Sequence, residues 1–95
     1  MDAINSRYEK MLDELETSYE KFISNYALEE TENYTNIDNG LLYRRFVFNR
    51  GISDYPIIVN PAGQIVEMDD KTPLDLIMQV TNASISCAYD QLCRI

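Results

Sequence analysis

The N-terminal part of the chain carries a strong helical pattern. Its apolar side chains recur at steps of three and four residues, at Ile4, Tyr8, Met11, Leu12, Leu15, Tyr19, Phe22, Ile23 and Tyr26. At 100° per residue these positions fall within one arc of about 120°, which is the pattern of an amphipathic helix. The spacing therefore predicts one long helix over residues 2–27. Because it also resembles a short heptad repeat, part of this helix is expected either to project from the domain or to pair with a second copy.

The pattern changes after this helix. Residues 28–40 lose the helical period and collect Asn, Thr, Glu and a final Gly, which predicts an acidic loop. β-branched and aromatic residues then predict three antiparallel strands, over residues 41–49, 55–59 and 64–68. The sequence Asn60-Pro61-Ala62-Gly63 predicts a tight turn between the last two strands.

The C-terminal segment predicts a second helix over residues 72–93. Thr72 is placed as its N-cap, Pro73 at the first helical position, and Asp75 where it reaches back as in a capping box. One apolar face of this helix is formed by Leu74, Ile77, Met78, Thr81, Ile85, Ala88 and Leu92. The predicted fold class is α+β, in the order α-β-β-β-α, with a three-stranded sheet of residues 41–68 packed against both helices in a single domain of residues 1–95.

Charge is unevenly distributed along the chain. Sixteen acidic and eight basic residues give a net charge of −8, which disfavours direct binding to nucleic acid or to an anionic membrane. Residues 1–40 hold ten acids and three bases and so carry −7, whereas residues 41–54 carry +2 and the remainder −3. The first forty residues therefore contain almost all of the excess acid.

Catalytic and metal-binding patterns are missing from the sequence. It has no histidine, so neither a serine nor a cysteine has the commonest general base beside it. Residues 35–40 fail as a calcium loop, because Thr35, Ile37 and Asn39 occupy the ligand positions. Asp69 and Asp70 are read as the polar turn before the second helix. We therefore expect a protein that is not an enzyme and has no cofactor or metal.

The cysteines and the lack of targeting signals point to the cytosol. Cys87 and Cys93 are six residues apart on the predicted helix, about 9 Å along its axis and on different faces, so they are expected to be buried reduced thiols. An intermolecular disulfide or a reactive thiol remains the alternative. No apolar run approaches the ~20 residues of a membrane span, and the first thirty residues do not resemble a signal peptide.

Acidic residues are sorted onto one flank of the first helix. Asp2, Glu9, Asp13, Glu16 and Glu20 fall within an arc of about 60° beside the apolar face, although each like-charge neighbour costs about 0.2–0.5 kcal/mol. The predicted loop adds Glu29, Glu30 and Glu32. We therefore predict that a partner is bound by Glu9, Asp13, Glu16, Glu20, Glu29, Glu30 and Glu32, which imitate a nucleic-acid backbone. The simpler interpretation is the solvated flank of a helix in an acidic protein.

Three arginines interrupt the acidic character. Arg44 and Arg45 are neighbours on a predicted strand and so point to opposite faces, and Arg50 follows at the strand's end. This division forms no phosphate-binding stripe. The arginines are instead expected to pair with acids of the same chain or of a second copy.

No motif places the chain in a family. In its small size, acidity, lack of catalytic residues and element order, it is similar to phage-encoded inhibitors such as anti-CRISPR and anti-restriction proteins, some of which are DNA mimics. That resemblance implies an inhibitor or regulator of a partner with a basic, nucleic-acid-binding surface. The double-stranded RNA-binding domain shares the element order, but Asp69, Asp70 and Asp75 stand where its lysine cluster would lie. The alternatives are an adaptor that forms a homodimer through the first helix, and a small enzyme that uses carboxylates.

Overall fold

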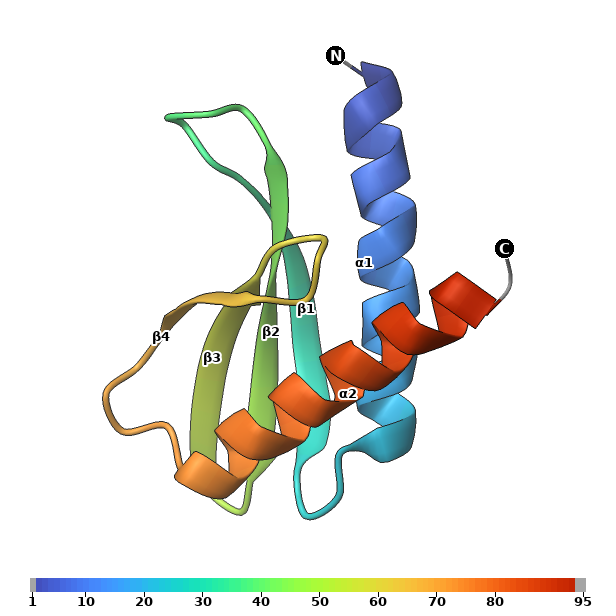
Figure 1. The fold of residues 1–95 in the computed structure, drawn as a ribbon. Helices are drawn as coiled ribbons and strands as arrows, with labels where there is room; N and C mark the ends of the chain where they lie inside the picture. The colour runs from blue at the N-terminus through green and yellow to red at the C-terminus, as the bar shows by residue number, and fades with distance from the viewer. Residues whose placement is uncertain (1, 94–95) are drawn as a thin grey trace.

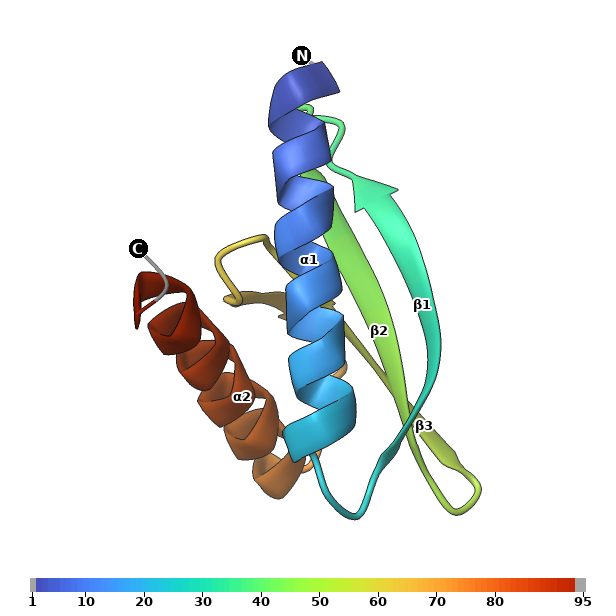
Figure 2. The same cartoon turned by 90° about the vertical axis from the view of Figure 1, so that its right-hand side faces the viewer.

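A computed structural model describes the backbone of residues 2–93 and the side chains of residues 5–89 (Figure 1). The elements are α1 (Asp2–Phe22), β1 (Ala27–Thr35), β2 (Leu42–Arg50), β3 (Ser53–Val59), β4 (Ile65–Met68) and α2 (Leu74–Cys93). The strands form one antiparallel sheet in the order β1-β2-β3-β4. Both helices contribute to a core on one face of this sheet (Figures 1 and 2). The predicted α+β class is confirmed, with four strands in place of three.

The additional strand, β1, takes up residues 28–35 of the predicted loop over residues 28–40, so that prediction was wrong there and held only for the turn over residues 36–40. β1 pairs with β2 from Ala27 opposite Asn49 to Thr35 opposite Leu42, with a β-bulge between Leu28 and Glu30. Only Leu28 is half-buried and the other side chains of β1 are exposed. The strand therefore lacks the alternation of apolar and polar residues that identifies strands in a sequence. Its structure depends on backbone pairing with β2, and an edge strand needs such a partner on one side only.

α1 ends at Phe22 and not at the predicted residue 27. Asn25 has a φ of 71°, a left-handed conformation that asparagine tolerates better than most residues, and the chain reverses there into β1. Ile23 and Tyr26 still pack into the core from this link. Because Ile23 and Tyr26 continue the helical spacing of apolar residues, the sequence pattern ran past Phe22, where the helix ends.

The remaining boundaries differ from the predictions by two residues or fewer. The tight turn is confirmed, because the Gly63 amide donates to the Asn60 carbonyl at 2.9 Å. α2 begins at Leu74 instead of residue 72. The Thr72 hydroxyl donates to the Asp69 carbonyl at 2.7 Å, so Thr72 closes the turn before the helix instead of acting as the predicted N-cap.

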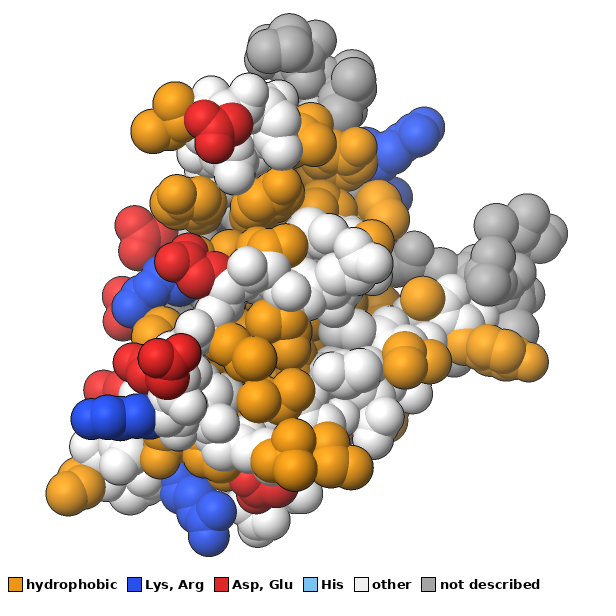
Figure 3. All heavy atoms as spheres, turned by 60° about the vertical axis from the view of Figure 1, so that its left-hand side comes forward, with side chains coloured by type: hydrophobic (Ala, Val, Ile, Leu, Met, Phe, Trp, Pro, Cys, Tyr) orange, Lys and Arg blue, Asp and Glu red, His pale blue; other side chains and the backbone are white. Residues whose placement is uncertain are grey.

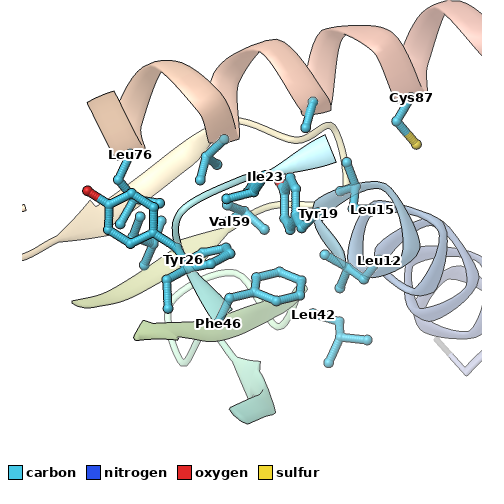
Figure 4. Close-up of a cluster of buried hydrophobic side chains, with 14 residues drawn as sticks. Leu12, Leu15, Tyr19, Ile23, Tyr26, Leu42, Phe46, Val59, Leu76 and Cys87 are labelled. Atoms are coloured by element: carbon cyan, nitrogen blue, oxygen red, sulfur yellow. The ribbon is translucent and has the colours of Figure 1, made fainter. Parts of the chain in front are cut away.

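The core is built around aromatic side chains from α1 and β2 (Figure 4). The Tyr19 ring packs edge-to-face against Phe46 and Phe48, with centroid distances of 4.9 and 5.9 Å. Tyr19 Oη lies 2.7 Å from Ser84 Oγ, so a hydrogen bond joins α1 to α2 inside the core. Burial raises the pKa of Tyr19 to about 12, although the Ser84 hydrogen bond acts in the opposite direction. A hydrogen bond between two uncharged side chains therefore links the two helices.

The buried face of α2 is not the predicted one. The helix is buried through Leu76, Val80, Ala83, Ser84 and Cys87. Most of the predicted face is exposed, namely Leu74, Met78, Thr81, Ile85 and Ala88, while Ile77 is half-buried and the Leu92 side chain lies outside the described residues. α2 carries apolar residues on both faces, so periodicity alone did not distinguish them. The small side chains of Ala83 and Ser84 face the core, and Ser84 lies close to Gly63.

Cys87 is the one cysteine whose side chain is described. It is a buried thiol on the core face of α2, as predicted (Figure 4). The Cys93 side chain lies outside the described residues.

Candidate partner-binding surface

The seven acids predicted to bind a partner come from α1 and β1, which run side by side at one edge of the molecule (Figure 2). We call this set the acidic edge, and it consists of Glu9, Asp13, Glu16, Glu20, Glu29, Glu30 and Glu32. The acids do not form one stripe. Asn33 of β1 is turned toward α1, where it binds Arg44, so its neighbour Glu32 points to the opposite face of the sheet, as does Glu30. The acidic edge therefore has a row on α1 and a row on the far side of β1.

Arg44 of β2 occupies the space between α1 and the sheet and is almost fully buried. Its Nη1 lies 2.6 Å from Asp13 Oδ1 and 3.4 Å from Glu16 Oε1, and its Nε donates to Asn33 Oδ1 at 2.8 Å. A buried guanidinium requires such partners, because an uncompensated charge in the interior is costly. Asp13 and Glu16 therefore neutralise Arg44. Glu9 and Glu20 on the same flank are exposed.

Acidic groups crowd together near the β-bulge of β1. A hydrogen bond with Asp54 of β3, together with the negative charge of that carboxyl, raises the pKa of Glu29 above its ordinary value, and Glu30 adds to the effect. Asp54 Oδ1 also accepts a hydrogen bond from Asn49 Nδ2 at 2.7 Å. The carboxyl groups of Glu29, Glu30 and Asp54 thus concentrate negative charge at the bulge.

The prediction that arginines pair within the chain is confirmed for Arg44 and Arg50. Arg50 Nη1 lies 3.8 Å from Asp75 Oδ2, and the guanidinium sits over the Tyr26 ring at 5.6 Å. The Tyr26 hydroxyl donates to Asp75 Oδ1 at 2.9 Å. These contacts connect the α1–β1 link, the end of β2 and the start of α2. Arg45 lies on the other face of β2, directly across from Glu32.

A second surface feature, an apolar groove, was missed by the sequence analysis. It has a volume of about 650 Å³ and lies between α2 and the β3–β4 hairpin, with Gly63, Ile65 and Met68 on the hairpin side and Ile77, Ser84 and Ile85 on the helix side. Hydrophobic side chains gather on this face of the molecule (Figure 3). It was missed because the exposed residues of α2 were assigned to the core. The available signal was that α2 is apolar on two faces.

The described residues form neither a metal-binding cluster nor a membrane-spanning helix. Among them, no three His, Cys, Asp or Glu side chains are grouped so that they would hold a metal ion. Within the same part of the chain, neither helix combines the length and apolar character needed to cross a membrane.

Comparison with known proteins gave no match to a protein-family model, to a curated protein or to a solved structure.

Proposed function

We propose that the chain is a non-enzymatic protein that inhibits or regulates a partner by covering its basic, nucleic-acid-binding surface with the acidic edge. The observation that carries this proposal is the presence of exposed carboxylates on both sides of the α1–β1 edge, with Glu9 and Glu20 on α1 and Glu30 and Glu32 on the outer face of β1. Such an edge brings negative charge to both walls of a basic groove that it enters. The net charge of −8 adds long-range attraction toward a cationic partner. A cytosolic, phage-encoded DNA mimic of the anti-CRISPR or anti-restriction kind is the form of this function that we favour.

The spacing of the acids approaches that of a phosphate backbone only when the two rows of the acidic edge are combined. Glu9 and Glu20 lie roughly 16 Å apart along the axis of α1, with Asp13 and Glu16 between them. Glu30 and Glu32 lie about 7 Å apart along β1. One DNA strand carries a phosphate every ~3.4 Å of axis, so neither row alone reaches that density. Both rows together are therefore required for a close imitation.

The alternative function, an adaptor that forms a homodimer through the first helix, needs an uncovered apolar face on α1. Leu12, Leu15 and Tyr19, at the centre of that face, are buried within the chain. A dimer through this face would have to separate α1 from its own sheet. We therefore do not favour this version of the adaptor function.

The test compares two variants of equal charge. Glu20→Lys with Glu30→Lys reverses one exposed acid in each row of the acidic edge, and it changes the net charge from −8 to −4, since each reversal adds two. The control, Glu67→Lys with Asp70→Lys, makes the same change at exposed acids away from the edge. Neither pair includes Asp13 or Glu16, whose loss would disturb Arg44. Circular dichroism verifies that both variants fold.

Each chain is immobilised and used to capture proteins from a bacterial lysate, and the captured proteins are quantified by mass spectrometry. We expect a basic protein that the wild type and the control retain and that the edge variant captures at least about tenfold less well. Raising the salt concentration weakens this capture, because charge screening weakens the attraction. Equal capture by all three chains, or equal loss in both variants, contradicts the proposal.

A further inference from the structure

β1 is a long strand at the outer edge of the sheet (Figure 2). It spans nine residues and, within residues 2–93, pairs on one side only, with β2, whereas the strand at the other edge, β4, has four residues. The β-bulge between Leu28 and Glu30 leaves the segment from Glu30 to Thr35 in regular pairing. In an antiparallel pair, alternate residues direct their amide and carbonyl groups away from the partner strand. These backbone groups of β1 are therefore open to a further strand.

We propose that β1 binds an extended basic segment of the partner protein, which joins the four-stranded sheet as an additional strand. This inference rests on the proposed function, because it names the part of the partner that meets the acidic edge. Backbone hydrogen bonds to β1 supply affinity in such strand addition, and the side chains beside the added strand supply selectivity.

The charge on the outer face of β1 selects the occupant. Glu30 and Glu32 point to this face two residues apart, and side chains directly across a strand pair lie about 4.5–5.5 Å from each other. On β2, the uncharged Val47 lies opposite Glu30, and Arg45 lies opposite Glu32. Arg45 therefore supplies one cation on this face for two acids. Lysine or arginine at alternate positions of an added strand comes to lie beside these acids.

Acids also lie close to the inner face and the bulge of β1. On the inner face, Asn33 and Glu16 both bind Arg44, so the α1 row of the acidic edge lies beside this strand. At the bulge, a hydrogen bond with Asp54 and the charge of that carboxyl raise the pKa of Glu29. A cationic side chain placed there lowers this pKa, because a nearby positive charge favours the ionised carboxylate. Basic residues are thus favoured along the length of an added strand.

The same acids disfavour two other occupants of the edge. A second copy would bring its own Glu30 and Glu32 to β1, and like charges directly across a strand pair are destabilising. A nucleic-acid strand would bring phosphates toward these carboxylates. Charged side chains and bulges are devices that protect edge strands from pairing with themselves. Here the charge has one sign, so the protection does not extend to a basic strand.

The test uses a peptide of about eight residues in which lysine and threonine alternate, and NMR of the full chain measures its binding. We expect a dissociation constant on the order of 10–100 μM and slower hydrogen exchange at alternate amides of residues 30–35. Two further peptides carry backbone N-methyl groups, one at its lysines and the other at its threonines. Alternate amides lie on opposite edges of a strand, so one methylated peptide is expected to bind at least about tenfold more weakly and the other within about threefold of the parent.

Glu30→Gln with Glu32→Gln is expected to weaken binding of the parent peptide at least about fivefold, because it removes the charges beside the added strand. Glu67→Gln with Asp70→Asn makes the same charge change at exposed positions away from β1 and is expected to stay within about twofold of the wild type. Circular dichroism verifies the fold of both variants.

The outcomes separate this inference from the proposed function. Equal binding of the two methylated peptides, exchange protection outside β1, or no binding of the parent peptide at about 500 μM overturns strand addition. None of these results affects the capture of a basic protein by the acidic edge. Strand-like binding of the peptide, combined with unchanged capture by Glu20→Lys with Glu30→Lys, contradicts the proposed function instead.

Discussion

Arg44 Nη1 and Asp13 Oδ1 lie 2.6 Å apart and join β2 to α1 beneath the acidic edge. The Arg44 side chain is 7% exposed and that of Asp13 is 64% exposed, so a buried positive charge is balanced by a carboxylate that also faces solvent. Glu16 shares this role at a longer distance. The acidic flank of α1 is therefore divided: Asp13 and Glu16 hold the helix on the sheet, whereas Glu9 and Glu20 are exposed to solvent.

The first prediction concerns the acceptors of Arg44. Asp13→Ala with Glu16→Ala is expected to lower the free energy of unfolding by about 2–3 kcal/mol, because the buried guanidinium loses both of the carboxylates that bind it and keeps the neutral Asn33. Urea unfolding measures this loss. The control Glu9→Ala with Glu20→Ala makes the same charge change at exposed positions and is expected to stay within about 0.5 kcal/mol of the wild type. Similar losses in both variants would show that Arg44 does not depend on its ion pairs.

The second prediction is a loss of stability at alkaline pH that originates at Tyr19. The unfolded chain releases this phenol proton near the ordinary pKa of 10.0, whereas burial raises the pKa in the folded chain to about 12. Between these values the folded state alone keeps the proton. The contribution of the Tyr19 phenol to the free energy of unfolding is thus fully present below pH 10. It falls by about 2–3 kcal/mol as the pH rises to 12.

Urea unfolding between pH 9 and 12 measures this dependence. Tyr19→Phe is expected to reduce it, because the substitution removes the Tyr19 phenol, whereas Tyr26, whose pKa burial also raises, keeps its smaller contribution. Tyr89→Phe, at an exposed position of α2, is expected to leave it unchanged. An identical pH dependence in the wild type and in Tyr19→Phe would disprove the assignment to Tyr19.

The third prediction concerns the turn that meets α2. A Cβ at Gly63 would lie 2.7 Å from Ser84 Cβ, and Gly63 has a φ of 86°. Gly63→Ala is therefore expected to destabilise the fold by about 2–4 kcal/mol, from steric overlap as well as backbone strain. Gly51→Ala is the control, because Gly51 has a φ of 65° but open space around it, and it is expected to cost only about 1–2 kcal/mol. Thermal unfolding compares the two, and equal losses would mean that the hairpin does not pack closely on α2.

The sequence predicted those elements in which buried and exposed side chains alternate with a regular period. α1 alternates apolar and charged faces, and β2 and β3 alternate apolar with other residues, so their existence followed from periodicity. β1 was missed because an exposed edge strand takes its structure from backbone bonds to β2. Residues such as Glu30 and Glu32 leave no strand-like pattern in the sequence. The same error placed the acids of residues 29–32 on a loop.

The candidate surfaces were predictable only in part. The charge sorting on α1 predicted an acidic flank, but it gave no sign that Arg44 is buried beneath Asp13 and Glu16, which depends on the position of β2 beside α1 and β1. The exposed face of α2 was unpredictable because Leu76 and Val80 compete with Met78 and Ile85 for the core. The face of α2 that is buried is the one on which Ser84 closely approaches Gly63. This contact joins residues that are far apart in the sequence.

We propose above that the acidic edge occupies the nucleic-acid-binding surface of a basic partner. The most direct measurement is fluorescence anisotropy of a labelled DNA duplex bound to the captured partner, while the chain is titrated in. We predict that the wild type and Glu67→Lys with Asp70→Lys displace the duplex, and that Glu20→Lys with Glu30→Lys requires at least about tenfold more protein. Duplex that stays bound while the chain saturates the partner would contradict the account.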